Sequence, residues 1–233
     1  MHYLTLRWFN MGMLLFLACK GLSLECWICN DIELDCTGTL KKCSSIFDSC
    51  AIVQSYNIRG QQYVLKTCKQ STSCYEGFTA IKFAEGETVF TKVSCCKGNG
   101  CNKAAPPLPD VNMTANGRKC QGCFAINRNR CFAEVVANCE GDQHYCSDVS
   151  GFAEVPSPIF AGSPALVIVI AFKGCVNKAF CDAHYEGVFH TSMLVVTARG
   201  RCQLASFMVR AAPQFFGLFL RALVGLLLAM NFA

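Results

Sequence analysis

Cysteine spacing constrains this chain more than any other feature of its sequence. Nineteen of the 233 residues are cysteine, a density typical of chains in which disulfides substitute for a large core in an oxidising compartment. Apart from Cys19, they form a block of ten and a block of eight. The first eight cysteines of the first block are separated by 3, 7, 7, 7, 18, 6 and 21 residues, and those of the second block by 3, 8, 8, 7, 29, 6 and 21 residues. Because the two series match closely, we expect two copies of one module of about 80 to 85 residues.

The N-terminal end has the features of a targeting segment. Residues 1–23 contain Arg7, an apolar stretch over residues 11–18, and the small residues Gly21 and Ser23. This order is typical of a cleaved signal peptide. A transmembrane anchor is the alternative, but it requires about 20 apolar residues, more than this stretch provides.

The C-terminal end resembles a GPI-attachment signal. The apolar run Phe215–Ala233 follows a short spacer, and Ala205 and Ser206 are the candidate attachment residues. Phe207 stands where a small residue is expected, and Arg221 interrupts the run. A hydrophobic tail in the form of a single spanning helix, or outright secretion, therefore stays an alternative.

The charge of the chain excludes a polyanion-binding class of protein. The formal net charge is +5, but Arg7, Lys20, Arg210 and Arg221 lie in the two terminal segments. Without them, 17 basic and 16 acidic residues remain. The mature chain is thus nearly neutral, which argues against a nucleic-acid partner.

Between the cysteines the sequence predicts short strands and turns. Segments rich in β-branched and aromatic residues are bounded by turn residues, and outside the two ends no stretch of a dozen residues has helical periodicity. The expected strands cover residues 51–56, 62–66, 88–93, 166–172 and 193–197. The predicted fold class is all-β.

A proline-rich linker separates the two copies. The predicted organisation is a signal peptide (1–23), a first domain with ten cysteines (24–103), a linker (104–117), a second domain with eight cysteines (118–204) and a GPI-attachment signal or hydrophobic tail (205–233). Asn112 begins the sequence Asn-Met-Thr in the linker. It is a candidate glycosylation site.

The motifs of the first copy resemble a known superfamily. It opens with Cys26-Trp-Ile-Cys29 and closes with Cys95-Cys-Lys-Gly-Asn-Gly-Cys-Asn102, and in both respects it is similar to the lymphocyte-antigen-six and urokinase-receptor superfamily of three-finger proteins. Two such modules in tandem, the second opening Cys120-Gln-Gly-Cys123, resemble gamma-type phospholipase A₂ inhibitors. The resemblance implies two tandem disulfide-rich three-finger domains.

The resemblance, and not the spacing, implies a disulfide pairing, because eight cysteines alone allow 105 arrangements. The implied pairs are Cys26–Cys50, Cys29–Cys36, Cys43–Cys68, Cys74–Cys95, Cys96–Cys101, Cys120–Cys146, Cys123–Cys131, Cys139–Cys175 and Cys181–Cys202. The second copy departs from the family pattern, because after Cys202 it lacks the last bridge and the terminal asparagine. How tightly its base is closed is therefore an open question.

The sequence predicts no enzyme, no metal and no cofactor. The two Cys-x-x-Cys pairs could form zinc or redox sites, but no histidine lies at ligand spacing, and structural disulfides are the preferred interpretation. His184, with Asp182 and Glu186, is the nearest approach to an acid/base cluster. On a strand these residues would share one face, and we interpret them as a polar edge.

Binding is expected on the fingers, because loops on a rigid frame usually carry function. The candidate residues lie on the two central fingers and are Tyr56, Ile58, Arg59, Phe152, Ile159 and Phe160. The second central finger also carries the apolar run Leu166–Phe172. That run either packs against the other module or its own long loop, or forms a hydrophobic partner surface.

The sequence thus predicts a non-catalytic extracellular binding protein with a protein ligand. The resemblance implies inhibition of secreted phospholipase A₂ by direct binding. The alternative is a GPI-anchored receptor or adhesion antigen at the outer face of the plasma membrane, attached through its lipid anchor.

Mass mapping of the mature protein under non-reducing conditions tests the cysteine frame. We expect nine disulfide bonds and no alkylated cysteine, because all 18 mature cysteines have a partner in the implied pairing. A free thiol among them would contradict it.

Overall fold

The protein is built almost entirely from antiparallel strands. A computed structural model describes residues 23–132, 135–155, 166–184, 188–191 and 194–207. The first copy contains β1 (Glu25–Asp31), β2 (Thr39–Lys42), β3 (Ser49–Asn57), β4 (Gln62–Lys69), the 3₁₀ turn η1 (Ser71–Ser73), β5 (Gly77–Ala84) and β6 (Glu87–Cys96). The second contains β7 (Ala115–Ile126), β8 (Val135–Glu140), β9 (Tyr145–Val155), β10 (Leu166–Val176), α2 (Lys178–His184), β11 (Val188–Thr191) and β12 (Leu194–Leu204).

Each copy forms three hairpins, and these are the fingers of a three-finger domain. In the first copy they are β1–β2, β3–β4 and β5–β6, and in the second β7–β8, β9–β10 and β11–β12. The predicted all-β, two-domain fold class is confirmed, and the segments expected as strands lie on β3, β4, β6, β10 and β12. β7 begins at Ala115, within the segment interpreted as a linker.

Nine disulfides cross-link the strands and loops of the two modules. Their partners are the same as those that the family resemblance implies. Modules of this size bury little apolar surface, so cross-links that restrict the unfolded chain are a large part of their stability, about 3 kcal/mol for a loop of some 15 residues.

Asn102 closes the base of the first module. Its side chain is fully buried, and its Oδ1 accepts the backbone NH of Trp27 at 2.9 Å. Its Nδ2 donates to the carbonyl oxygens of Trp27 at 2.9 Å and Ala51 at 3.3 Å. One asparagine therefore joins the C-terminal loop to two strands, and a buried side chain with this many partners is strongly fixed.

The second module closes its base with backbone hydrogen bonds instead of a last disulfide. The NH of Ala205 donates to the carbonyl of His144 at 2.9 Å, and the NH of Lys119 donates to the carbonyl of Ser206 at 2.7 Å. The Arg118 guanidinium donates to the Ala205 carbonyl at 2.7 Å. Ala205 is buried, so the module extends beyond residue 204, where the sequence indicated its end.

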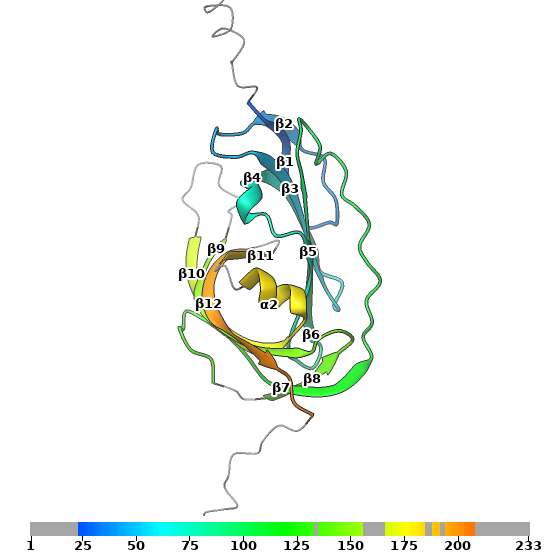
Figure 1. Cartoon of the computed structure of the whole chain (residues 1–233), viewed down its shortest axis with the longest axis vertical. Coiled ribbons are helices and arrows are strands. Elements are labelled where there is room, and N and C mark those ends of the chain that lie inside the picture. The colour runs from blue at the N-terminus through cyan, green and yellow to red at the C-terminus, as the bar shows by residue number, and fades with distance from the viewer. Residues whose placement is uncertain (1–22, 133–134, 156–165, 185–187, 192–193, 208–233) are drawn as a thin grey trace, which may run out of the picture.

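The two modules share one continuous sheet. Its strand order is β11-β12-β9-β10-β5-β6-β3-β4-β1-β2, with β7 and β8 attached at β10. β10 of the second module pairs with β5 of the first through Cys175–Lys82 and Val176–Ile81. Figure 1 shows the sheet curving around α2, with β12 on one side of the helix and β5 on the other.

Inside this curve lies a core to which both modules contribute. Phe180 of α2 is almost completely buried among alternate residues of β9, β10 and β12, and Ile81 of β5 joins them. Ile170 and Phe172 point into this core, while Val167 on the opposite face is half exposed. The apolar run of β10 thus packs largely within the protein, which is the first of the two interpretations given above.

Asn177 ties the core helix to the first module. Its Oδ1 accepts the NH of Phe180 at 3.2 Å, the bond of a helix N-cap. The same oxygen accepts the NH of Ala80 at 3.2 Å, and its Nδ2 donates to the Phe78 carbonyl at 2.8 Å. Asn177 therefore caps α2 of the second module and also forms hydrogen bonds with β5 of the first module.

Lys82 forms a buried ionic link across the same junction. Its side chain is 2% exposed, and its Nζ lies 2.6 Å from Oε1 of Glu140 and 3.0 Å from Oε2 of Glu85. Burial lowers the pKa of Lys82, but the hydrogen bonds and charges of the two carboxylates outweigh it, and the net pKa is raised. Glu85 also accepts hydrogen bonds from the backbone and side chain of Asn138 in the second module.

Replacing Lys82 by methionine should destabilise the whole protein. The change keeps the length of the side chain but leaves the Glu140 carboxylate, 17% exposed, without its cation. We expect the free energy of unfolding to fall by about 3 kcal/mol, measured by denaturant unfolding under oxidising conditions. Lys41→Met, on the exposed strand β2, is the control. Equal losses in the two variants would show that the buried link contributes nothing.

Candidate functional site

A groove with a mixed polar and apolar lining lies where the β7–β8 finger of the second module meets the first module. It has a volume of about 370 Å³ and is lined by Ala84 of the first module together with residues of the β7–β8 finger of the second. The finger thus forms most of the groove, and the first module borders it at Ala84. The lining apolar side chains of the finger are those of Phe124, Ala125, Ile126, Phe132 and Val135.

The β7–β8 finger carries an unusual share of exposed apolar surface. Of the fourteen large apolar side chains exposed in the described part of the chain, five lie on this finger, namely Phe124, Ile126, Phe132, Val135 and Val136. Phe132 is 73% exposed and Ile126 is 53% exposed. Four of the five, all except Val136, line the same groove. Scattered exposed apolar residues are normal, but a gathered group of this kind is a candidate interaction site.

A row of aromatic rings supports the outer part of strand β7 in this finger. Phe83 of the first module lies between Phe124 and Phe172 of the second, with ring centroids 5.4 Å and 5.7 Å away. The Phe172 ring continues the row to Phe180 of α2 at 5.9 Å. The finger is therefore held on the core by a residue of the other module.

Glycine allows this close approach. A Cβ at Gly122 would lie 2.0 Å from the Phe83 carbonyl oxygen, and one at Gly174 would lie 2.1 Å from the Lys82 carbonyl oxygen. Any larger residue at either position would push the β5–β6 hairpin away from the second module.

Two arginines stand at the end of the groove. Arg128 and Arg130 line it and are exposed, and within the described residues neither forms an ion pair. Asn127 just before them has a left-handed backbone (φ 58°), and its NH donates to the Val169 carbonyl at 2.6 Å. The turn thus holds both cations beside the apolar surface.

The candidate residues of the first central finger are anchored within their own module. Tyr56 stacks on Phe90 with centroids 5.0 Å apart, and burial raises the pKa of its phenol. Arg59 forms an ion pair with Glu87 of the neighbouring finger. Ile58 is exposed, and it is the candidate of this group that a partner could bury.

The second central finger presents Phe152 on its outer face. This side chain is 57% exposed, and Val167 on the adjacent strand is also exposed. Ile159 and Phe160 lie outside the described residues.

The sequence analysis predicted no binding residue on the β7–β8 finger. Five large apolar residues between Cys123 and Cys139 could have indicated one.

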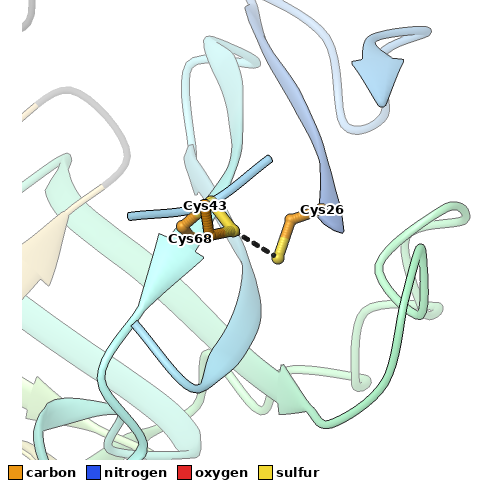
Figure 2. A group of neighbouring side chains, drawn as sticks. All are labelled: Cys26, Cys43 and Cys68. Carbon is orange, nitrogen blue, oxygen red and sulfur yellow. Dashed lines mark hydrogen bonds between the residues drawn. A yellow bond between two sulfur atoms is a disulfide. The ribbon is translucent and has the colours of Figure 1, made fainter. Parts of the chain in front are cut away.

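Sulfur atoms gather at the base of each module without forming a metal site. Cys26, Cys43 and Cys68 lie close together, as do Cys120, Cys139 and Cys175. Figure 2 shows the first group, in which the sulfurs of Cys26 and Cys43 are 3.2 Å apart. Each of these sulfurs belongs to a disulfide, so none is available as a thiolate ligand.

The segment around His184, interpreted from the sequence as a polar edge on a strand, is a helix. Lys178–His184 forms α2, capped by Asn177 and supported by an ion pair in which Lys178 and Asp182 are 2.7 Å apart. The expectation that alternate residues of this segment share one face of a strand is therefore wrong. Glu186 lies outside the described residues.

None of the helices in the described part of the chain has the length and apolar character needed to cross a membrane.

Comparison with known proteins gives a consistent set of relatives. The chain is 28% identical over 170 residues to phospholipase A₂ inhibitor NAI of Notechis ater, covering 71% of this chain and 80% of that protein. It is 25% identical over 163 residues to a gamma-type phospholipase A₂ inhibitor chain of Laticauda semifasciata, covering 68% and 84%. The resemblance to gamma-type inhibitors is thus confirmed at the level of sequence similarity.

A third inhibitor and one solved structure are also similar to this chain. Phospholipase A₂ inhibitor LNF1 of Lachesis muta muta is 28% identical over 173 residues, covering 71% of this chain and 80% of the inhibitor. The crystal structure of mouse TEX101 aligns with 77% of this chain and 99% of its own, at 15% identity and a TM-score of 0.35. No protein-family profile matches the chain.

Proposed function

We propose that this protein is a non-catalytic extracellular inhibitor that binds secreted phospholipase A₂ directly, through the groove between its two modules. The observation that carries the proposal is the exposed apolar surface of the β7–β8 finger at the junction. The relatives that match across both modules are phospholipase A₂ inhibitors by name. Their similarity supports the choice of partner.

The physical properties of the groove fit a protein ligand. Its apolar side chains are backed by the aromatic row from Phe83 to Phe180 and by the shared core. A preorganised surface loses little conformational entropy on binding, which favours affinity. The exposed Arg128 and Arg130 favour an acidic rim on the partner.

Binding to a panel of purified secreted phospholipases A₂ tests the proposal. We expect the mature protein to bind at least one of them at or below micromolar concentration and to lower its rate of phospholipid hydrolysis. The double variant Ile126→Ser, Phe132→Ser should bind about 30-fold more weakly, as expected for loss of interface hot spots. Ile32→Ser removes an equally exposed residue of the first module and should change affinity less than twofold. Absence of binding at micromolar concentration would refute the inhibitor function.

Membrane attachment is a separate part of the proposal. The chain is expected to enter the secretory pathway through residues 1–23, to carry a glycan on the exposed Asn112, and to exchange its apolar tail for a GPI anchor. Of the two candidate attachment residues, Ser206 is preferred, because its carbonyl accepts the Lys119 NH that closes the second module, and cleavage after Ala205 would remove this bond.

Treatment of expressing cells with phosphatidylinositol-specific phospholipase C distinguishes an anchored receptor or adhesion antigen from a soluble inhibitor. An anchored protein should appear in the medium only after treatment. Its appearance in the medium without treatment would argue against the anchor and favour the soluble form.

A further inference from the structure

A hollow with a cationic lining lies on the outer face of the second module. It has a volume of about 450 Å³ and is lined by Lys119 of β7, Lys173 of β10 and Arg201 of β12, among other residues. It shares no lining residue with the groove at the module junction. It lies where the chain leaves the sheet, because Leu204 and Ser206 form part of its wall.

Strand pairing fixes the positions of these cations. Arg201 and Lys173 lie opposite Asp148 on either side of β9, so the three charges form a row across adjacent strands about 4.8 Å apart. Lys119 is held at the opposite wall by the bond from its NH to the Ser206 carbonyl, 2.7 Å. The arrangement is a product of the sheet and not of a mobile loop.

The charges in the hollow do not cancel. Asp148 pairs with Lys173, with Oδ2 and Nζ 3.1 Å apart. Within the described residues, Lys119 and Arg201 form no ion pair, and both are exposed. Two cations are therefore free to bind an anionic group, and arginine in particular matches the oxygen geometry of phosphate.

An exposed apolar side chain stands beside the cations. Leu204, in the wall of the hollow, is 69% exposed. An exposed leucine next to cations suits a phospholipid, which carries its phosphate outside and its acyl chains below.

We infer that this hollow binds the phosphate of a phospholipid headgroup while Leu204 contacts the apolar part of the lipid. The second module would thus carry a lipid site in addition to the groove proposed to bind a protein. The inference is independent of the proposed inhibitor function, since it involves none of the residues that line the groove and no phospholipase.

Calorimetric titration of the mature protein with dihexanoyl phosphatidylglycerol, kept below its micelle concentration, tests the site. Arg201→Gln and Lys119→Gln should each weaken binding about tenfold, because each removes a hydrogen bond to a charged group. Arg199→Gln is the matched control. It lies two residues earlier on the same face of β12, opposite Ser150, and does not line the hollow, so it should change affinity less than twofold.

Titrations with glycerol 3-phosphate and with a heparin oligosaccharide show whether the hollow prefers a phospholipid, a free phosphate ester or a sulfated polysaccharide. Glycerol 3-phosphate should bind more weakly than the lipid, and Leu204→Ser should remove this difference, because it deletes the apolar contact. Equal losses in Arg199→Gln and Arg201→Gln would overturn the inference in favour of diffuse surface charge. Equal affinity for glycerol 3-phosphate and the lipid, or binding of heparin without the lipid, would also overturn it.

Discussion

The pairing of β5 with β10 is the interaction on which the rest of the structure depends. It converts two disulfide-bonded modules into one sheet, and it places Ile81 in the core of the second module. Asn177 extends this pairing by bonding to Ala80 and Phe78 while it caps α2. A thin three-finger sheet cannot bury both faces by itself, and this junction gives the inner face its cover.

The junction also supports the surface at which we propose that a partner binds. Phe83 from the first module supports Phe124 of the second, and Ala84 completes the groove beside it. Stability and binding therefore share a physical basis, because the buried Lys82 link and the aromatic row hold the surface that the exposed finger presents. By contrast, the cationic hollow belongs to the second module alone, and its cations are placed by the register of β9, β10 and β12.

Unequal closure of the two modules follows from their different C-terminal sequences. The first ends in a small disulfide loop and the buried Asn102, which bonds to Trp27 and Ala51. The second has no such loop, and Arg118, Ala205 and Ser206 close its base with hydrogen bonds. Closure by hydrogen bonds keeps the chain on the sheet as far as Ser206 and leaves Leu204 exposed in the wall of the hollow.

The sequence by itself determined the repeat, the strands of the central fingers and, through the family resemblance, the cysteine partners, because these depend on spacing and local side-chain pattern. It misassigned Lys178–His184, since a helix of seven residues has too few turns to show periodicity and is stabilised by Asn177 and the core around Phe180. Only the tertiary structure decided which apolar residues stay exposed. Phe172 and Phe132 are equally apolar in sequence, but the docking of β5 and α2 buries the first and leaves the second in solvent.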